Sequence, residues 1–138
     1  LDGAHNPDGM AVLARTLDAL VNELPSGTAT LLLGVMRDKE VTEMLQALAG
    51  SRRLRNAPCV ATAVPGTDRA LPAATLAAQW SAIARGASEA VPEVEVALAR
   101  AQAMARSAGG PLVVAGSLYL VGDVRARLVP GTISDTDV

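Results

Sequence analysis

The chain of 138 residues is long enough for one domain with a sizeable core, and half of its residues are apolar. Its formal net charge is −2, from 12 basic and 14 acidic residues, so the sequence indicates no broad basic field and no nucleic-acid partner. No apolar run approaches the ~18 residues that a membrane span needs, so no membrane partner is expected either.

The first nine residues, LDGAHNPDG, resemble the end of a buried strand that is cut off at its start and runs into a ligand-facing turn. Asn6 or Asp8 can cap the helix that follows, and Pro7 suits its first turn. Apolar residues then recur at helical spacing and predict a helix of about four turns, which Pro25-Ser26-Gly27 ends. These apolar residues are Val12, Leu13, Leu17, Leu20, Val21 and Leu24.

The remaining elements alternate between strands and helices. Thr28–Val35 (TATLLLGV) is apolar almost without interruption, which is typical of a strand buried on both faces of a parallel sheet. Further strands are expected within Ala57–Val64, near Ala87–Val91 and at Leu112–Gly116. Further helices are expected at Glu40–Ala49, Pro72–Ala84, Glu93–Arg106 and Ser117–Leu128.

This alternation predicts an α/β fold with a mostly parallel, Rossmann-like sheet, helices on both faces and a truncated first strand. We expect one domain over residues 1–129 and a flexible tail over 130–138. In such sheets ligands bind beyond the carboxyl ends of the strands, so the loops at Asp2–Asp8, Gly34–Lys39 and Gly116–Tyr119 are the candidate site.

The first loop carries the most chemistry. Asp2 would lie at a strand tip, where its carboxylate could accept hydrogen bonds from a ribose, and Gly3 and Ala4 keep the turn small. His5 is the single histidine and can donate, accept or titrate near neutral pH, while Asn6 caps the helix. The alternative interpretation is a capped turn with a surface histidine.

The other two loops each allow two interpretations. Arg37 or Lys39 could contact a phosphate, or Asp38 could cap a helix between solvated basic neighbours. Ser117 could help bind an anion such as a carboxylate at a helix N-terminus, or serve only as a helix cap.

Two further features have structural explanations. The cluster Arg52, Arg53 and Arg55 is expected to be a solvated helix end. Cys59 lies in an apolar strand and is expected in the core, which fits a reducing cytoplasm. Phosphate-loop and dinucleotide fingerprints are absent from the sequence, as are Cys/His clusters with metal-ligand spacing, so no independent catalytic apparatus is evident.

Three motifs, LDGAHNP, GVMRDKE and PLVVAGSLYLVGDVR, resemble in order and spacing the C-terminal domain of folylpolyglutamate synthase/dihydrofolate synthase, within the Mur ligase superfamily. The similarity spans nearly the whole chain. Gly3 stands where peptidoglycan Mur ligases more often carry Tyr, which favours the folate branch.

The resemblance implies part of an ATP-dependent ligase that joins L-glutamate to folate or dihydropteroate through an acyl phosphate. It implies that Asp2 contacts the ATP ribose, that His5 and Ser117 bind glutamate, and that Asn6, Asp38 and Lys39 support the site. The phosphate loop and the Mg²⁺ ligands are expected in an N-terminal ATPase domain that this chain lacks, so the chain alone is expected to be inactive. The alternatives are another Mur-type ligase that acts on a peptidoglycan precursor and a non-catalytic binding module.

Overall fold

A computed structural model describes residues 5–20 and 22–128 of the chain. Its centre is a sheet of four strands that all run parallel, in the order β3-β2-β1-β4. The strands are β1 (Thr30–Leu33), β2 (Cys59–Ala61), β3 (Ser88–Ala90) and β4 (Leu112–Ala115). The expectation of a Rossmann-like α/β fold is therefore confirmed, whereas the truncated first strand and the tail over 130–138 lie outside the described residues.

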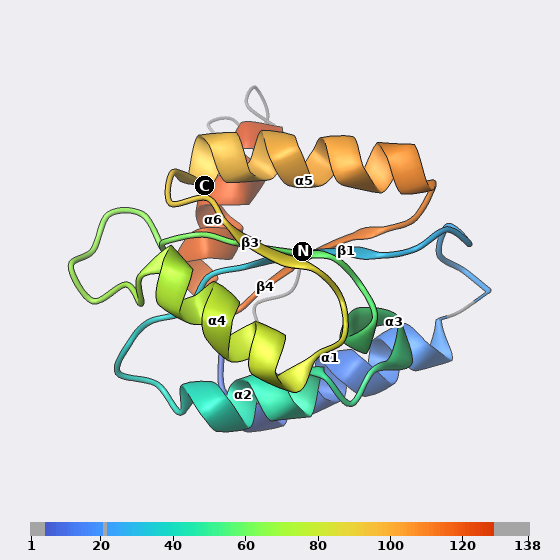
Figure 1. Cartoon of the computed structure of the whole chain (residues 1–138), viewed down its shortest axis with the longest axis horizontal. Helices are drawn as coiled ribbons and strands as arrows, with labels where there is room; N and C mark the ends of the chain where they lie inside the picture. The colour runs from blue at the N-terminus through green and yellow to red at the C-terminus, as the bar shows by residue number, and fades with distance from the viewer. Residues whose placement is uncertain (1–4, 21, 129–138) are drawn as a thin grey trace, which may run out of the picture.

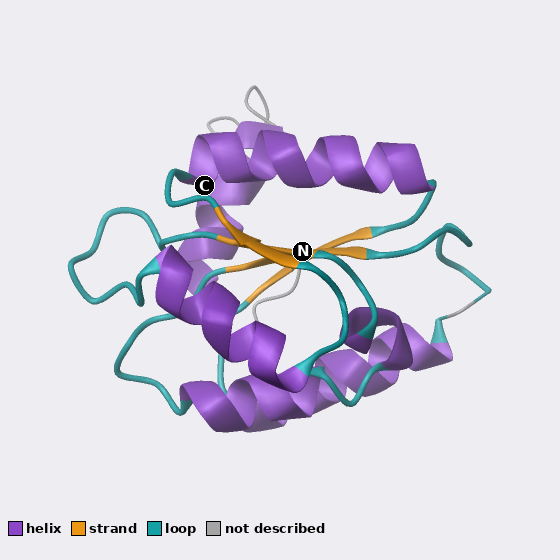
Figure 2. Cartoon of the chain, viewed as in Figure 1, coloured by secondary structure: helices purple, strands orange, loops and turns teal. Residues whose placement is uncertain are grey.

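Helices cover both faces of this sheet, as Figures 1 and 2 show. Among the described residues, one layer holds four helices and the other holds two. The fold thus has three layers with the sheet in the middle. The first layer contains α1 (Pro7–Ala19), α2 (Val41–Leu48), α3 (Arg52–Arg55) and α4 (Ala73–Ile83). The second contains α5 (Val94–Ala108) and α6 (Leu118–Leu128).

The alternation of side chains along β1 divides the core into two parts. Leu31 and Leu33 pack in the cluster formed with the first helix layer, whereas Leu32 packs in the cluster formed with α5 and α6. All three leucines are fully buried. The continuous apolar run therefore reflects a strand that is covered on both faces.

The first helix begins where the sequence predicts and ends earlier. The Gly9 amide donates a 2.8 Å hydrogen bond to Asn6 Oδ1, and Pro7 occupies the first turn. The helix ends at Ala19, and Leu24 packs against the core from the turn that follows. The apolar periodicity overestimated the length of the helix, because an apolar residue can also reach the core from a turn.

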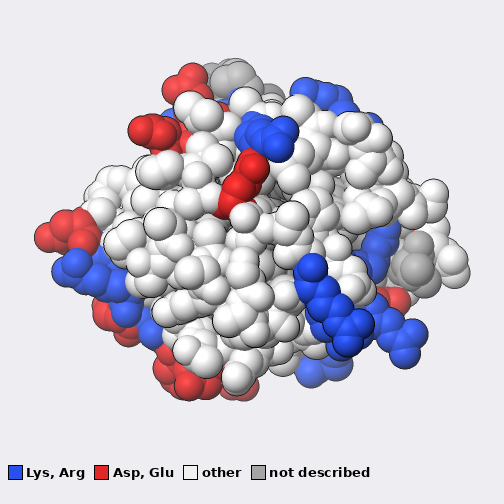
Figure 3. All heavy atoms as spheres, in the orientation of Figure 1, with Lys and Arg blue, Asp and Glu red and all other residues white. Residues whose placement is uncertain are grey.

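The arginine cluster, expected to be a solvated helix end, forms a short helix of its own, α3, in which Arg52 is exposed. The hydroxyl of Ser51 caps it by accepting from the Leu54 amide at 3.4 Å, and Leu54 is fully buried. Arg53 is half-buried because its guanidinium donates to the Pro25 carbonyl at 2.6 Å. Figure 3 shows basic side chains on the side where α3 lies, with both signs of charge elsewhere on this face.

The strand order places a topological switch between β1 and β4. From β1 the chain moves to β2 and β3 on one side and then returns to β4 on the other. Beyond the paired strands, Gly116 comes so close to Gly34 that an added Cβ would lie 2.3 Å from the Gly34 carbonyl oxygen. Ligands of such sheets bind in the crevice at this point.

The expected burial of Cys59 is confirmed. Cys59 on β2 is fully buried, and this burial raises the pKa of its thiol to about 12. Within the part of the chain that the structure describes, no helix has both the length and the apolar character to cross a membrane.

Candidate functional site

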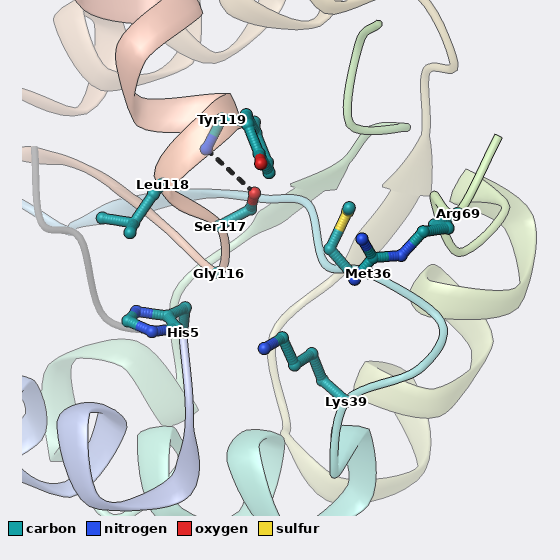
Figure 4. Close-up of a pocket in the computed structure, with 8 residues that line it drawn as sticks. All are labelled: His5, Met36, Lys39, Arg69, Gly116, Ser117, Leu118 and Tyr119. Carbon is teal, nitrogen blue, oxygen red and sulfur yellow. Dashed lines mark hydrogen bonds between the residues drawn. The ribbon is translucent and has the colours of Figure 1, made fainter. Parts of the chain in front are cut away.

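A cavity of about 340 Å³ lies beyond the carboxyl ends of β1 and β4, at the switch point. Figure 4 shows the segment after β1 and Arg69 on one side, the start of α6 on another, and His5 below. The residues that line it are His5, Met36, Lys39, Arg69, Gly116, Ser117, Leu118 and Tyr119. Four chain segments, distant in sequence, thus meet where the sheet topology predicts a ligand.

Gly116 and Ser117, directly before α6, form a buried part of the cavity wall. Ser117 is 2% exposed, and its Oγ accepts hydrogen bonds from the amides of Tyr119 at 3.1 Å and Leu120 at 3.5 Å. Ser117 therefore does cap α6, as one of the two interpretations holds. Capping uses the oxygen as an acceptor and leaves the hydroxyl proton to donate elsewhere, so the cap and a ligand contact are compatible.

Gly116 sets the position of this serine. Its φ is 116°, a conformation that L side chains rarely adopt, and it faces the Gly34 carbonyl directly. The glycine at position 116 allows the two chain segments beyond β1 and β4 to approach closely. The Gly-Ser pair after a buried strand is thus explained by backbone geometry as well as by hydroxyl chemistry.

The loop after β1 brings positive charge to the cavity. Lys39 reaches toward it in Figure 4, and among residues 5–20 and 22–128 no carboxylate forms an ion pair with this lysine. Asp38 does not cap α2, because the N-cap residue is Glu40 and its side chain makes no capping hydrogen bond. Asp38 instead pairs with Arg69, with 2.6 Å between its Oδ2 and the arginine Nη2.

The structure brings several of the expected site residues together. His5, Lys39 and Ser117 all line the cavity. Asn6 lies next to His5 as the cap of α1, and Asp38 lies behind Arg69. Asp2, expected at a ribose, lies outside the described residues, so its position stays a prediction.

Arg69 is the charged cavity residue that the sequence analysis missed. It belongs to the loop that follows β2, which was not among the three loops expected to form the site. A signal was available, since the carboxyl end of β2 lies at the same sheet edge as those of β1 and β4. Met36, Leu118 and Tyr119 lie in two of the expected site loops but were given no role there, and the last two are exposed by 58% and 66% at the cavity rim.

The charged groups suit an anion rather than a metal ion. Lys39, Arg69 and the N-terminal end of α6 all favour negative charge in the cavity. Among the described residues, no group of three or more His, Cys, Asp or Glu side chains could hold a metal ion.

Comparison with known proteins identifies the same family as the resemblance of the three sequence motifs. The family model described as the C-terminal domain of dihydrofolate synthetase matches residues 1–128. A folylpolyglutamate synthase from Lacticaseibacillus casei is 32% identical over 135 residues, which are 95% of this chain and 27% of that protein. This chain thus spans about a quarter of that relative's length.

Two solved structures have the same fold. One is a Mycobacterium tuberculosis folylpolyglutamate synthase complexed with ADP and AMPPCP, with a TM-score of 0.73 and 25% identity over 92% of this chain and 28% of that one. The other is a bifunctional folylpolyglutamate synthase/dihydrofolate synthase with Mn, AMPPNP and L-glutamate bound. Its TM-score is 0.69, with 25% identity over 93% of this chain and 28% of that one.

Proposed function

Because the chain belongs to the family of the dihydrofolate synthetase C-terminal domain, we propose that it is one part of an ATP-dependent ligase. The ligase joins L-glutamate to folate or dihydropteroate, and this chain helps to bind ATP and glutamate and closes the site. An N-terminal ATPase domain is the partner, since relatives such as the L. casei enzyme are about four times as long. A cytoplasmic location suits this ATP-consuming reaction.

The observation that carries this proposal is the cationic cavity at the switch point. L-Glutamate brings two carboxylates, and the cavity offers Lys39 together with the N-terminal end of α6. Its volume of about 340 Å³ falls at the lower end of the range for small-molecule sites. A related structure that contains L-glutamate adds support.

We assign roles to the residues as follows. The Ser117 hydroxyl donates to a glutamate carboxylate while its oxygen caps α6. His5 borders the amino acid, and Asn6 fixes His5 by anchoring the start of α1. Lys39 supplies positive charge, Asp38 supports the same loop, and Asp2 contacts the ATP ribose.

The reaction needs a carboxylate to be phosphorylated and the acyl phosphate to be attacked by the glutamate amine. An acyl phosphate hydrolyses when water reaches it, so a domain that closes over the site protects the intermediate. The exposed Leu118 and Tyr119 at the cavity rim can exclude water once the site is closed. A bound Mg²⁺ would neutralise phosphate charge, and we place its ligands in the ATPase domain, as the family resemblance implies.

The test is ADP release by the complete protein that contains this chain, with ATP, Mg²⁺ and L-glutamate, and with or without dihydropteroate or tetrahydrofolate. We expect release that depends on both pterin and glutamate, and its loss in Asp2→Ala and His5→Ala. Arg15→Ala, at an exposed position on α1, is the matched control and should behave like the unsubstituted protein. Absence of pterin-dependent release would refute the proposed function in favour of another Mur-type substrate or a binding module.

A further inference from the structure

We propose that Arg69 binds one carboxylate of the amino-acid substrate and that Asp38 positions its guanidinium for this contact. The inference rests on the proposed glutamate-ligase function and adds a specificity-determining residue to it. It starts from the one charged cavity residue, among those the structure describes, to which the proposed function gives no role.

The contacts of Arg69 leave it ready to bind an anion. Its Nη2 donates to Asp38 Oδ2 at 2.6 Å, and both side chains are half exposed. Asp38 does not line the cavity, whereas Arg69 does. The carboxylate therefore holds one corner of the guanidinium from outside, and the other N–H donors remain for a planar anion such as a carboxylate.

The backbone around Arg69 is fixed to the segment that carries Lys39. The Arg37 amide donates to the Arg69 carbonyl at 2.7 Å, and the Leu71 amide donates to the Val35 carbonyl at 2.9 Å. Met36 and Ala70 form an antiparallel bridge between these two hydrogen bonds. The two cations of the cavity thus stand on paired chain segments, so their spacing is set by backbone hydrogen bonds.

This arrangement provides two separate places for negative charge. Ser117 and the N-terminal end of α6 lie on one side of the cavity, and Arg69 lies on the side formed by the segment after β1 (Figure 4). An amino acid with two carboxylates can bind both sides at once, which orients its amine. An amino acid with one carboxylate leaves one side unpaired, so the arrangement selects a dicarboxylic substrate.

The pair contributes little to the stability of the fold, because exposed ion pairs are weak. This allows a functional test that a folding defect does not obscure. A similar pair away from the cavity, Arg100 and Glu89 at 2.7 Å, provides the matched control variant Arg100→Ala.

The first experiment measures steady-state ADP release by the complete protein as L-glutamate is varied. Arg69→Ala should raise the KM for L-glutamate about 10- to 100-fold with a smaller change in kcat, because a charge-assisted contact is lost. Asp38→Asn should raise this KM about two- to fivefold, the range of an exposed ion-pair partner. The double variant Asp38→Asn/Arg69→Ala should match Arg69→Ala alone, because Asp38 acts only through Arg69.

The second experiment replaces L-glutamate with its two monoamides, L-glutamine and L-isoglutamine. For each monoamide, the discrimination ratio is the kcat/KM for L-glutamate divided by the kcat/KM for the monoamide. If Arg69 binds a carboxylate, one of the two ratios should collapse in Arg69→Ala and be unchanged in Arg100→Ala. An Arg69→Ala variant that keeps both ratios and the KM of the unsubstituted protein would overturn the inference and leave the proposed function intact. An unsubstituted protein without glutamate-dependent ADP release would overturn both.

Discussion

Substituting Gly116 with alanine should destabilise the fold more than any ordinary glycine-to-alanine change. Two costs add at this position. The φ of 116° strains any L residue by about 1–3 kcal/mol. The new Cβ would lie 2.3 Å from the Gly34 carbonyl oxygen and 2.9 Å from a methyl carbon of Val35.

The second cost follows from these distances. Because the nearest atom is backbone, the chain beyond β1 or β4 must shift, and overpacking of this kind costs about 1–3 kcal/mol. The sum is about 2–6 kcal/mol, against a total stability of about 5–15 kcal/mol for a domain. Urea unfolding monitored by far-UV circular dichroism measures this loss directly.

Two other glycines separate the cost of backbone strain from the cost of steric overlap. Gly109, at the C-terminal end of α5, has a φ of 66° and no atom within 4 Å of an added Cβ, so Gly109→Ala should cost only about 1–2 kcal/mol of strain. Gly122, inside α6, has free space and a φ outside the left-handed region, so Gly122→Ala should stabilise by about 0.5–1 kcal/mol. If Gly116→Ala costs no more than Gly109→Ala, the close approach of Gly34 and Gly116 does not constrain the fold and the reasoning is wrong.

Four further outcomes are expected. Leu32→Ala should lower the free energy of unfolding by about 2–5 kcal/mol in urea titration, because Leu32 is fully buried between β1 and the α5–α6 layer; a loss below 1 kcal/mol would contradict this packing. Ser51→Ala should lower the free energy of unfolding by about 1–2 kcal/mol, because it removes the cap of α3 and a 2.9 Å hydrogen bond to Asp18. An unchanged unfolding midpoint would show that the cap is dispensable. Burial raises the pKa of the Cys59 thiol from 9.0 to about 12, so the unfolded chain loses this proton at a lower pH than the folded chain. The free energy of unfolding should therefore fall between these pH values by up to about 1.4 kcal/mol per pH unit. Unfolding curves of Cys59→Ala should lack this pH-dependent loss. The 138-residue chain alone should release no ADP from ATP, L-glutamate and pterin, and detectable pterin-dependent release would show that it needs no ATPase domain.

Local patterns in the sequence were enough to determine the layered α/β architecture. The unbroken apolar run around β1 predicted a doubly covered strand, and Asn6-Pro7 predicted the start of α1. The Gly116-Ser117 pair predicted a helix that begins at a sheet edge. These features are readable because burial periodicity, helix capping and glycine backbone preferences depend on residues close together in the chain.

Tertiary structure alone decided the features that depend on distant partners. The end of α1 and the separate existence of α3 depend on which elements pack against them, and periodicity does not record this. Arg69 reached the cavity because the loop after β2 pairs with the segment after β1, and Asp38 became its partner instead of a helix cap. Contacts between residues some thirty positions apart carry no local signature, so the pairing of Arg69 with Asp38 could be found only in the folded chain.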